Sequence, residues 1–175
     1  MRITGGVLRG RQVEVPGGSI RPAMDRMRES VFAVLGDITE KSFLDLFTGS
    51  GIIALEAASR GAGPLEAVEA DRQKRETLLK NAAIAPVRIQ CRFMAAELYV
   101  KRAKRAFDII FCDPPFPYKF KNELLSSLAA SPVMGGASLL LIHYPREEQL
   151  VIPGTLLKKD SRLFGRSKVD FFIKN

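Results

Sequence analysis

The sequence predicts a single α/β domain built around a mostly parallel seven-stranded sheet. From residue 42 onward, short apolar runs alternate with helical patterns, and short connections of this kind require crossovers between parallel strands. Hydrophobic residues make up 46% and charged residues 26% of the 175 positions, which is typical of one soluble globular domain. The last two segments, 156–164 and 168–174, look like strands joined across Gly165, which predicts an antiparallel C-terminal hairpin.

The N-terminal part is predicted to form a short extension to this domain. The first 20 residues are rich in glycine and alternate at 12–15, which indicates a β-hairpin. Apolar positions at helical spacing predict a helix over 25–35, with Asp25 as its cap and Gly36 at its end. We therefore divide the single domain, 1–175, into an extension (1–36) and a core (42–175).

The core elements follow from the alternation of apolar runs and helical patterns. Each apolar run bounded by glycine, proline or charged residues predicts a strand, and each amphipathic segment between two runs predicts a helix. The predicted strands are 42–47, 65–70, 87–93, 107–112, 137–143, 156–164 and 168–174. The predicted helices are 51–60, 71–83 with Asp71 as a cap, 95–103 and 122–130.

The charge balance points to a polyanionic partner. Lys and Arg number 27 against 19 Asp and Glu, giving a net charge of +8. Such a surface is typical of a protein that binds nucleic acid or, less commonly, an anionic membrane surface. The alternative is a basic surface that contacts only solvent. No apolar run approaches the roughly 20 residues that span a bilayer, and no signal peptide is evident, so we expect a cytoplasmic monomer.

Cysteine and histidine are too few for several kinds of site. The chain has two cysteines, Cys91 and Cys112, and one histidine, His143. A zinc site, a disulfide scaffold and a Ser-His-Asp triad are all disfavoured, and no metal is expected. His143 ends a predicted strand, and we expect it to be structural rather than catalytic.

A glycine-containing loop follows the first core strand. Asp45-Leu46-Phe47-Thr48-Gly49-Ser50-Gly51 leads from strand to helix, where α/β sheets bind nucleotide-like ligands. Glu69 ends the next strand, eighteen residues after Gly51, and a carboxylate there accepts hydrogen bonds from ribose hydroxyls. This pattern indicates an adenosine-containing ligand, but it fits NAD as well as S-adenosylmethionine.

The motif Asp113-Pro114-Pro115-Phe116 distinguishes the two ligands. It follows the predicted strand 107–112, so it lies close to the glycine loop. The prolines remove two backbone donors and leave carbonyl acceptors, beside a carboxylate and an aromatic ring. An exocyclic amine on a nucleobase needs such acceptors, and the ring holds the base plane.

These residues resemble a known family. The Asp113 to Phe116 motif is similar to that of class I S-adenosylmethionine-dependent methyltransferases acting on exocyclic amines, which have a Rossmann-like fold. The N-terminal residues add a narrower match: Arg2-Ile3-Thr4-Gly5-Gly6, Arg9-Gly10-Arg11, Arg21-Pro22 and Asp25-Arg26-x-Arg28-Glu29-x-x-Phe32. Together they resemble the RsmD family of bacterial 16S rRNA guanine-N2 methyltransferases. The resemblance implies methylation of one guanine, guanine 966, in 16S rRNA or in a 30S subunit or assembly intermediate.

The resemblance also implies which residues bind each ligand. Phe93 stands where relatives place Asp or Asn, so the adenine ring would rely on stacking and on the Met94 backbone. S-adenosylmethionine would then contact Asp45, Phe47, Gly49, Ser50, Gly51, Glu69 and Met94. Catalysis would involve Asp113, Pro114, Pro115 and Phe116. An RNA-contacting extension would use Arg2, Arg9, Arg11, Arg21, Arg26 and Arg28.

Three other functions remain open at the level of the sequence. An adenine-N6 methyltransferase of DNA or RNA would use the same acceptor motif. A catalytically silent RNA-binding module would not need Asp45, Glu69 and Asp113 at three strand ends. A nucleotide-dependent dehydrogenase fits the glycine loop, but not the Asp113 motif.

Overall fold

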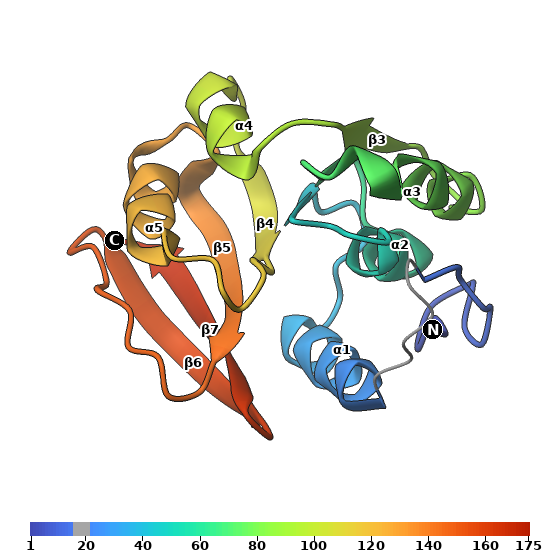
Figure 1. The fold of residues 1–175 in the computed structure, drawn as a ribbon, viewed down its shortest axis with the longest axis horizontal. Coiled ribbons are helices and arrows are strands. Elements are labelled where there is room, and N and C mark those ends of the chain that lie inside the picture. Colours follow the sequence, from blue (N-terminus) through green and yellow to red (C-terminus); the bar gives the residue numbers. More distant parts are fainter. Residues whose placement is uncertain (16–21) are drawn as a thin grey trace.

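The computed structural model describes residues 1–15 and 22–175. Within these ranges, seven strands form one sheet in the order β3-β2-β1-β4-β5-β7-β6 (Figure 1). The strands are β1 (Phe43–Leu46), β2 (Leu65–Val68), β3 (Ile89–Arg92), β4 (Phe107–Cys112), β5 (Met134–Pro145), β6 (Leu156–Phe164) and β7 (Ser167–Lys174). The first five strands are parallel to one another, whereas β7 is antiparallel to β5 and to β6. The predicted mixed sheet with its C-terminal hairpin is confirmed.

Helices cover both faces of the sheet. They are α1 (Pro22–Leu35), α2 (Ile52–Ser59), α3 (Arg75–Ala82) after a 3-10 turn η1 (Arg72–Lys74), α4 (Ala96–Arg102) and α5 (Lys121–Ala130). Alternate strand residues face opposite ways, so Phe43 packs with α1 and α2 while Leu44 packs with α4 and α5. Figure 1 shows these two groups of helices on opposite sides of the sheet. Because β1 lies between β2 and β4 and is parallel to both, the carboxyl ends of these three strands lie together at one edge of the sheet.

The expected N-terminal β-hairpin is not formed. A single antiparallel bridge joins Arg2 and Gln12, and turns occupy the residues between them. Backbone hydrogen bonds join residues 1–3 to residues 10–13, and the segment between them binds α2: the Val7 N–H donates to the Ser59 carbonyl at 2.8 Å. Gly6 adopts a φ of +73°, and a Cβ there would lie 1.9 Å from that same carbonyl oxygen. Close approach to α2 therefore explains a glycine at this position better than a hairpin turn does.

Two predicted helix caps have different outcomes. Asp71 accepts a hydrogen bond from the Gln73 N–H at 2.9 Å, so it caps η1 as predicted. Asp25 was predicted to cap the first helix, and this is wrong, because α1 already begins at Pro22. Asp25 instead lies in the first turn, where its carboxylate is 2.8 Å from the Arg28 guanidinium.

Two further properties hold for the part of the chain that the structure describes. None of its helices is long and apolar enough to cross a membrane. It contains no group of three or more His, Cys, Asp or Glu side chains placed to hold a metal ion.

Candidate active site at the strand ends

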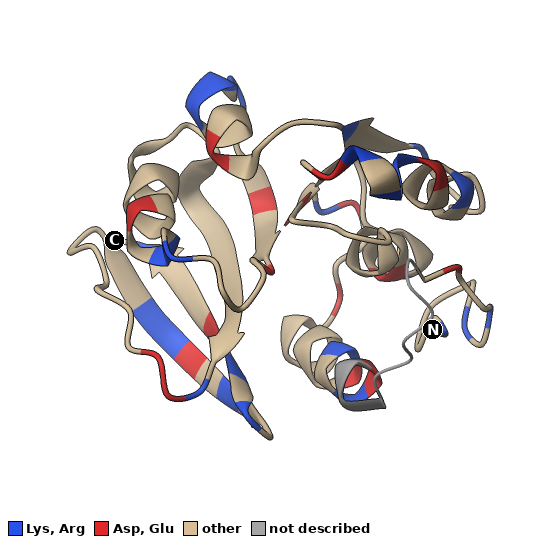
Figure 2. Cartoon of the chain, in the orientation of Figure 1, with Lys and Arg blue, Asp and Glu red and all other residues tan. Residues whose placement is uncertain are grey.

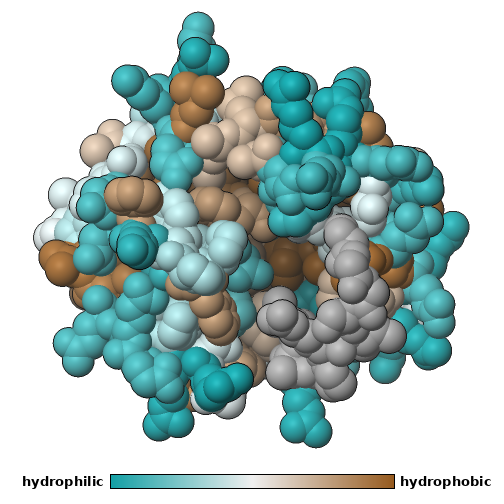
Figure 3. Space-filling model, viewed as in Figure 1, coloured by the Kyte–Doolittle hydropathy of each residue, from teal (hydrophilic) through white to brown (hydrophobic). Residues whose placement is uncertain are grey.

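A cavity of about 500 Å³ lies where β1, β2, β4 and β5 end. Its lining includes aromatic, acidic and proline side chains from four separate segments. The lining residues are Phe47, Glu69, Lys74, Asp113, Pro114, Pro115, Phe116, Pro117 and His143. Figure 3 shows one face of the molecule, on which hydrophilic side chains dominate the outline and hydrophobic ones gather near the middle. The cavity combines apolar walls with few polar groups, which is typical of a ligand site.

The glycine loop forms one wall of this site. Phe47 and Gly49 have φ values of +61° and +58°, so the backbone turns sharply after β1. A Cβ added at Gly49 would meet no atom within 4 Å, so the loop backbone is open on that side. Gly51 forms the N-terminal cap of α2, whose first N–H groups are unpaired by the helix itself. A ligand can therefore approach the backbone closely here.

Glu69 connects the ends of two strands. One carboxylate oxygen accepts the Gly49 N–H at 2.8 Å, and the other accepts the Asp71 N–H at 2.8 Å. The Lys74 ammonium lies 3.7 Å away. Each carboxylate oxygen has two lone pairs, so both remain able to accept a ligand hydroxyl. The geometry fits the predicted ribose contact.

Asp45 lies beneath the loop rather than in the cavity wall. It is fully buried, and one oxygen accepts hydrogen bonds from the Thr48 hydroxyl and from the Ala54 N–H, the latter at 3.1 Å. Its other oxygen has no partner among the described atoms. Burial raises the pKa of Asp45 to about 7. The hydrogen bonds from Thr48 and Ala54 lower the pKa, and the negative charges of Asp113 and Glu69 raise it further. Asp45 was predicted to contact the cofactor, but it is buried under the loop and does not line the cavity, so it supports the glycine turn from below.

The Asp113 motif forms the opposite wall. The Asp113 N–H donates to the Leu46 carbonyl at 3.2 Å, which ties the motif to the end of β1. The Phe116 ring is 44% exposed and meets the His143 ring edge-on at 5.5 Å. Buried Lys121 donates to the Phe116 and Tyr118 carbonyls at 3.0 and 2.6 Å and pairs with Glu148. The loop after β4 is therefore anchored from below, while its aromatic ring stays accessible.

The predicted cofactor residues are only partly brought together. Phe47 and Glu69 line the cavity, and Gly49 and Gly51 shape the loop beside it. Ser50 is buried, and its carbonyl accepts a hydrogen bond from Asn81. Met94 lines a different cavity, of about 330 Å³, whose wall also includes Glu66, Tyr99 and Arg105. The Glu69 N–H donates to the carbonyl of Arg92, two residues before Met94, at 2.9 Å, and the contact of Met94 with the cofactor stays a prediction.

Sequence reasoning missed three lining residues, namely Lys74, Pro117 and His143. Lys74 and Pro117 carry no motif of their own. His143 could have been found from strand pairing, because Ile142 lies opposite Cys112 in the sheet and the next residues are therefore His143 and Asp113. That pairing depends on β5 lying beside β4, which local sequence patterns do not determine.

The predicted RNA-binding arginines differ in exposure. Arg2, Arg9, Arg11 and Arg26 are exposed, and Arg21 lies outside the described residues. Figure 2 shows Lys and Arg spread over the N-terminal segment, α3, the end of α4 and the β6–β7 hairpin. The exposed four remain candidates for phosphate contacts.

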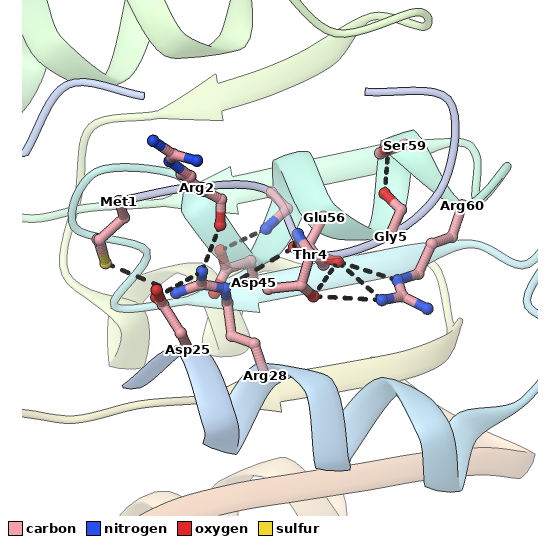
Figure 4. A network of polar contacts seen from close by, with 11 residues as sticks. Met1, Arg2, Thr4, Gly5, Asp25, Arg28, Asp45, Glu56, Ser59 and Arg60 are labelled. Carbon is pink, nitrogen blue, oxygen red and sulfur yellow. Dashed lines mark hydrogen bonds and ion pairs between the residues drawn. The ribbon is translucent and has the colours of Figure 1, made fainter. Parts of the chain in front are cut away.

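Arg28 is not available to RNA, and its prediction as an RNA contact is wrong. Its side chain is fully buried. The guanidinium donates to the Arg2 carbonyl at 2.6 Å and to Asp25 at 2.8 Å, and Nε lies 3.8 Å from buried Glu56 (Figure 4). Glu56 also accepts the Thr4 N–H and hydroxyl at 2.8 and 2.7 Å. Arg28 therefore holds the N-terminal segment against α1 and α2.

Comparison with known proteins identifies the family of this chain. The family described as "Conserved hypothetical protein 95" matches residues 1–173. Ribosomal RNA small subunit methyltransferase D of Escherichia coli strain K12 is 32% identical over 153 residues, covering 86% of this chain and 77% of that protein. The chain belongs to the RsmD family. This is a family of S-adenosylmethionine-dependent methyltransferases, so the expectation from the N-terminal and Asp113 motifs is confirmed.

Further similar proteins include a second methyltransferase D, a solved structure and a tRNA methyltransferase. The enzyme of the same name from Haemophilus influenzae is 29% identical, covering 91% of this chain and 87% of that protein. A solved Escherichia coli structure, yhhF, is 29% identical with a TM-score of 0.89, covering 100% of this chain and 98% of that one. A tRNA1(Val) (adenine(37)-N6)-methyltransferase of Pedobacter heparinus is 38% identical over 95 residues, covering 53% of this chain and 38% of that protein. Similarity to the RsmD proteins thus extends over most of the chain, whereas similarity to the tRNA enzyme covers about half.

Proposed function

We propose that this chain transfers a methyl group from S-adenosylmethionine to the exocyclic N2 amine of a guanine in small-subunit rRNA, with guanine 966 of 16S rRNA as the target. The observation that carries the proposal is the position of Asp113 and Pro114 opposite Glu69 and the glycine loop around one cavity. The chain-long similarity to rRNA small subunit methyltransferase D supports rRNA as the substrate.

Glu69, Phe47 and the Gly49 backbone would hold the cofactor. The Glu69 oxygens accept the ribose hydroxyls, the Phe47 ring packs against the cofactor, and the open face of Gly49 lets it approach the loop. When bound, S-adenosylmethionine supplies a methyl group already activated by a positively charged sulfur. A protein of the same fold, SMU.776, has been solved with S-adenosylhomocysteine at 16% identity and a TM-score of 0.73, which supports a cofactor of this class.

Asp113 and Pro114 would prepare the amine. The N2 lone pair of guanine is delocalised into the ring, so this nitrogen is a poor nucleophile. Acceptance of its two N–H bonds by the Asp113 carboxylate and the Pro114 carbonyl favours a more tetrahedral nitrogen with its lone pair facing the methyl group. The lone pair forms the N–C bond, the C–S pair of electrons stays on sulfur, and Asp113 or water takes one proton from N2. Holding both reactants in this geometry supplies on the order of 7–11 kcal/mol.

The exposed Phe116 ring would stack on the target base, and the exposed arginines of the extension would hold the RNA backbone. Stacking on an aromatic side chain contributes about 1–3 kcal/mol per base. Arg2, Arg9 and Arg11 place positive charge on the N-terminal segment that binds α2, and Arg26 adds to it from α1. Arginine suits this role because it binds phosphate through two parallel hydrogen bonds.

Methylation of an adenine N6 amine is the second candidate. The acceptors Asp113 and Pro114 serve that amine as well, and the partial match to the tRNA adenine-N6 enzyme favours keeping it. The two candidates differ in the modified nucleoside and in the RNA that carries it.

One experiment separates the candidates. The protein is incubated with labelled S-adenosylmethionine and 30S particles, naked 16S rRNA, tRNA or duplex DNA, and the products are digested and identified by mass spectrometry. We expect N2-methylguanosine from small-subunit rRNA, with Asp113→Ala as the inactive control. Labelled N6-methyladenosine would replace the proposal by the second candidate, and no transfer to any substrate would leave an RNA-binding role.

A further inference from the structure

His143 lies directly behind Asp113, in a position that the proposed mechanism does not use. Its Nδ1 atom is 2.8 Å from the Asp113 Oδ1 atom, and its Nε2 atom is 2.8 Å from the Ser167 hydroxyl. The imidazole is 3% exposed, whereas the Asp113 side chain is 24% exposed toward the cavity. The three side chains therefore form a line from the sheet interior to the site.

The sheet holds this line rigidly. Asp113 directly follows β4, and the neighbouring strand β5 carries His143, since Cys112 is paired with Ile142. On the other side, β7 begins at Ser167, opposite Pro145 of β5. Two adjacent strands, β5 and β7, thus contribute His143 and Ser167, and Asp113 is the first residue after the neighbouring strand β4. Residues on strands are positioned more precisely than residues on loops, which suits a geometric role.

The hydrogen-bond partners determine where the imidazole carries a proton. An ionised carboxylate only accepts hydrogen bonds, so the contact with Asp113 requires a proton on Nδ1. The Ser167 hydroxyl can donate to Nε2 of a neutral ring. It can also accept from Nε2 of a charged ring while it donates to the Phe164 carbonyl at 3.1 Å. In both states His143 donates from Nδ1 to Oδ1 of Asp113.

We propose that His143 is a positioning residue for methyl transfer, holding Oδ1 of Asp113 so that Oδ2 faces the substrate amine. The proposal rests on the proposed function, because it assigns Asp113 to the amine. A carboxylate attached only through its Cα–Cβ and Cβ–Cγ bonds rotates freely in an open cavity. The Nδ1 donor fixes its plane, and Ser167 in turn fixes the imidazole. The Phe116 ring, edge-on to His143, gains its orientation from the same group.

A purely structural histidine would satisfy the same contacts, so the test needs variants that separate packing from hydrogen bonding. His143→Ala removes the donor. His143→Asn places an amide N–H near the position of Nδ1 and keeps the donor without the ring. Ser167→Ala removes only the outer anchor. Tyr144→Phe is the matched control, because Tyr144 is the next residue on β5, is equally buried, and donates its hydroxyl to Asp170 on the other face of the sheet.

The kinetic measurement is single-turnover methyl transfer to 30S particles at saturating cofactor and RNA, with cofactor affinity measured separately by calorimetry. We expect His143→Ala to lower the rate about 10- to 100-fold, since a misplacement of about 1 Å can cost on the order of 100-fold. Cofactor affinity should not change. His143→Asn should recover most of the rate, Ser167→Ala should lose less than His143→Ala, and Tyr144→Phe should match the wild type. A wild-type rate for His143→Ala, or equal rates for His143→Asn and His143→Ala, would overturn the proposal.

A spectroscopic measurement keeps the proposal testable if His143→Ala does not fold or if the RNA substrate is wrong. The chain has a single histidine, so ¹⁵N-labelled histidine gives the NMR signals of His143 alone. We expect a protonated Nδ1 whose signal shifts strongly in Asp113→Ala and little in Tyr144→Phe. An unprotonated Nδ1, or signals unchanged by Asp113→Ala, would show that the contact is absent in solution. Wild-type protein that methylates no rRNA but retains the Asp113-dependent signal would overturn the proposed function alone.

Discussion

The Glu69 carboxylate accepts the backbone N–H of Gly49 at 2.8 Å, so the end of β2 fastens the turn that follows β1. The same side chain accepts the Asp71 N–H and thereby holds the start of η1. One carboxylate therefore orients two loops and still offers lone pairs to the cavity. Removing this carboxylate should therefore disturb both loops on the proposed cofactor side of the cavity.

We expect Glu69→Ala to weaken S-adenosylmethionine binding roughly 10- to 100-fold, because hydrogen bonds to a charged group contribute about 1.5–3 kcal/mol. Glu69→Gln keeps one acceptor oxygen and should lose less. Isothermal titration calorimetry measures both. Asp71→Ala is the control, since Asp71 caps η1 and does not line the cavity. Unchanged affinity of Glu69→Ala would remove Glu69 from the cofactor site.

Asp113 should act mainly as an acceptor that orients the amine. Asp113→Ala is then expected to lose about 2.7–4 kcal/mol of transition-state stabilisation, the range seen when one preorganised polar group is removed. Asp113→Asn retains one acceptor oxygen and should fall between Ala and wild type, with cofactor binding intact in both. Single-turnover methyl transfer by the three proteins gives the comparison. If Asn were as inactive as Ala, proton removal rather than orientation would be the main role of Asp113.

The exposed arginines Arg9 and Arg11 should bind RNA phosphates. The double substitution Arg9→Glu/Arg11→Glu is expected to weaken RNA binding and to flatten its salt dependence by about one slope unit per lost contact. Filter-binding titrations at several salt concentrations measure the slope. Lys101→Glu/Arg102→Glu, which changes two exposed residues at the end of α4, controls for net charge. Equal slopes for the two double variants would place the RNA elsewhere.

Arg28 should matter for stability instead. Arg28→Ala leaves buried Glu56 without one of its cationic neighbours and is expected to lower the free energy of unfolding by about 3–5 kcal/mol. Arg26→Ala, on the exposed side of the same helix, should change it by less than about 0.5 kcal/mol. Urea unfolding followed by circular dichroism compares them. A stable Arg28→Ala protein with weakened RNA binding would restore the role first predicted for Arg28.

Asp45 should make stability fall as pH rises from about 4 to about 7. Its pKa is raised by burial from 3.8 to about 7, so in this range the folded state binds more protons than the unfolded state. Ionising the buried carboxyl therefore costs the folded state stability. This loss is absent below the unfolded pKa and complete above pH 7, where it is on the order of 4 kcal/mol. Asp45→Asn removes this component. The free energy of unfolding of Asp45→Asn minus that of the wild type should therefore be larger at pH 8 than at pH 5, and an equal difference at both values would contradict the assignment.

Local patterns predicted most of the fold because most strands of the core are short apolar runs, and because Gly165 marks the turn of the C-terminal hairpin. The bounds of β4, 107–112, and of β6, 156–164, match the prediction, and the parallel strands place Glu69 and Asp113 at one edge. The rest depends on contacts between distant residues. Arg28 looks like its exposed neighbours in the sequence, and its burial depends on the Arg2 carbonyl and on Glu56, which lie on other segments. The His143–Asp113 contact depends on strand order in the same way.

The attachment of the N-terminal segment to α2 has a consequence for how this protein can vary. One end of the helix carries the Gly51 cap and the cofactor turn, and the other end carries Glu56 and Ser59, which bind Thr4 and Leu8 of the extension. All eight residues of α2 are buried. Selection for cofactor binding and selection for the segment that we propose contacts RNA therefore act on the same short helix. Few substitutions in α2 satisfy both, so this helix should diverge more slowly among descendants than the exposed helix α3 beside it.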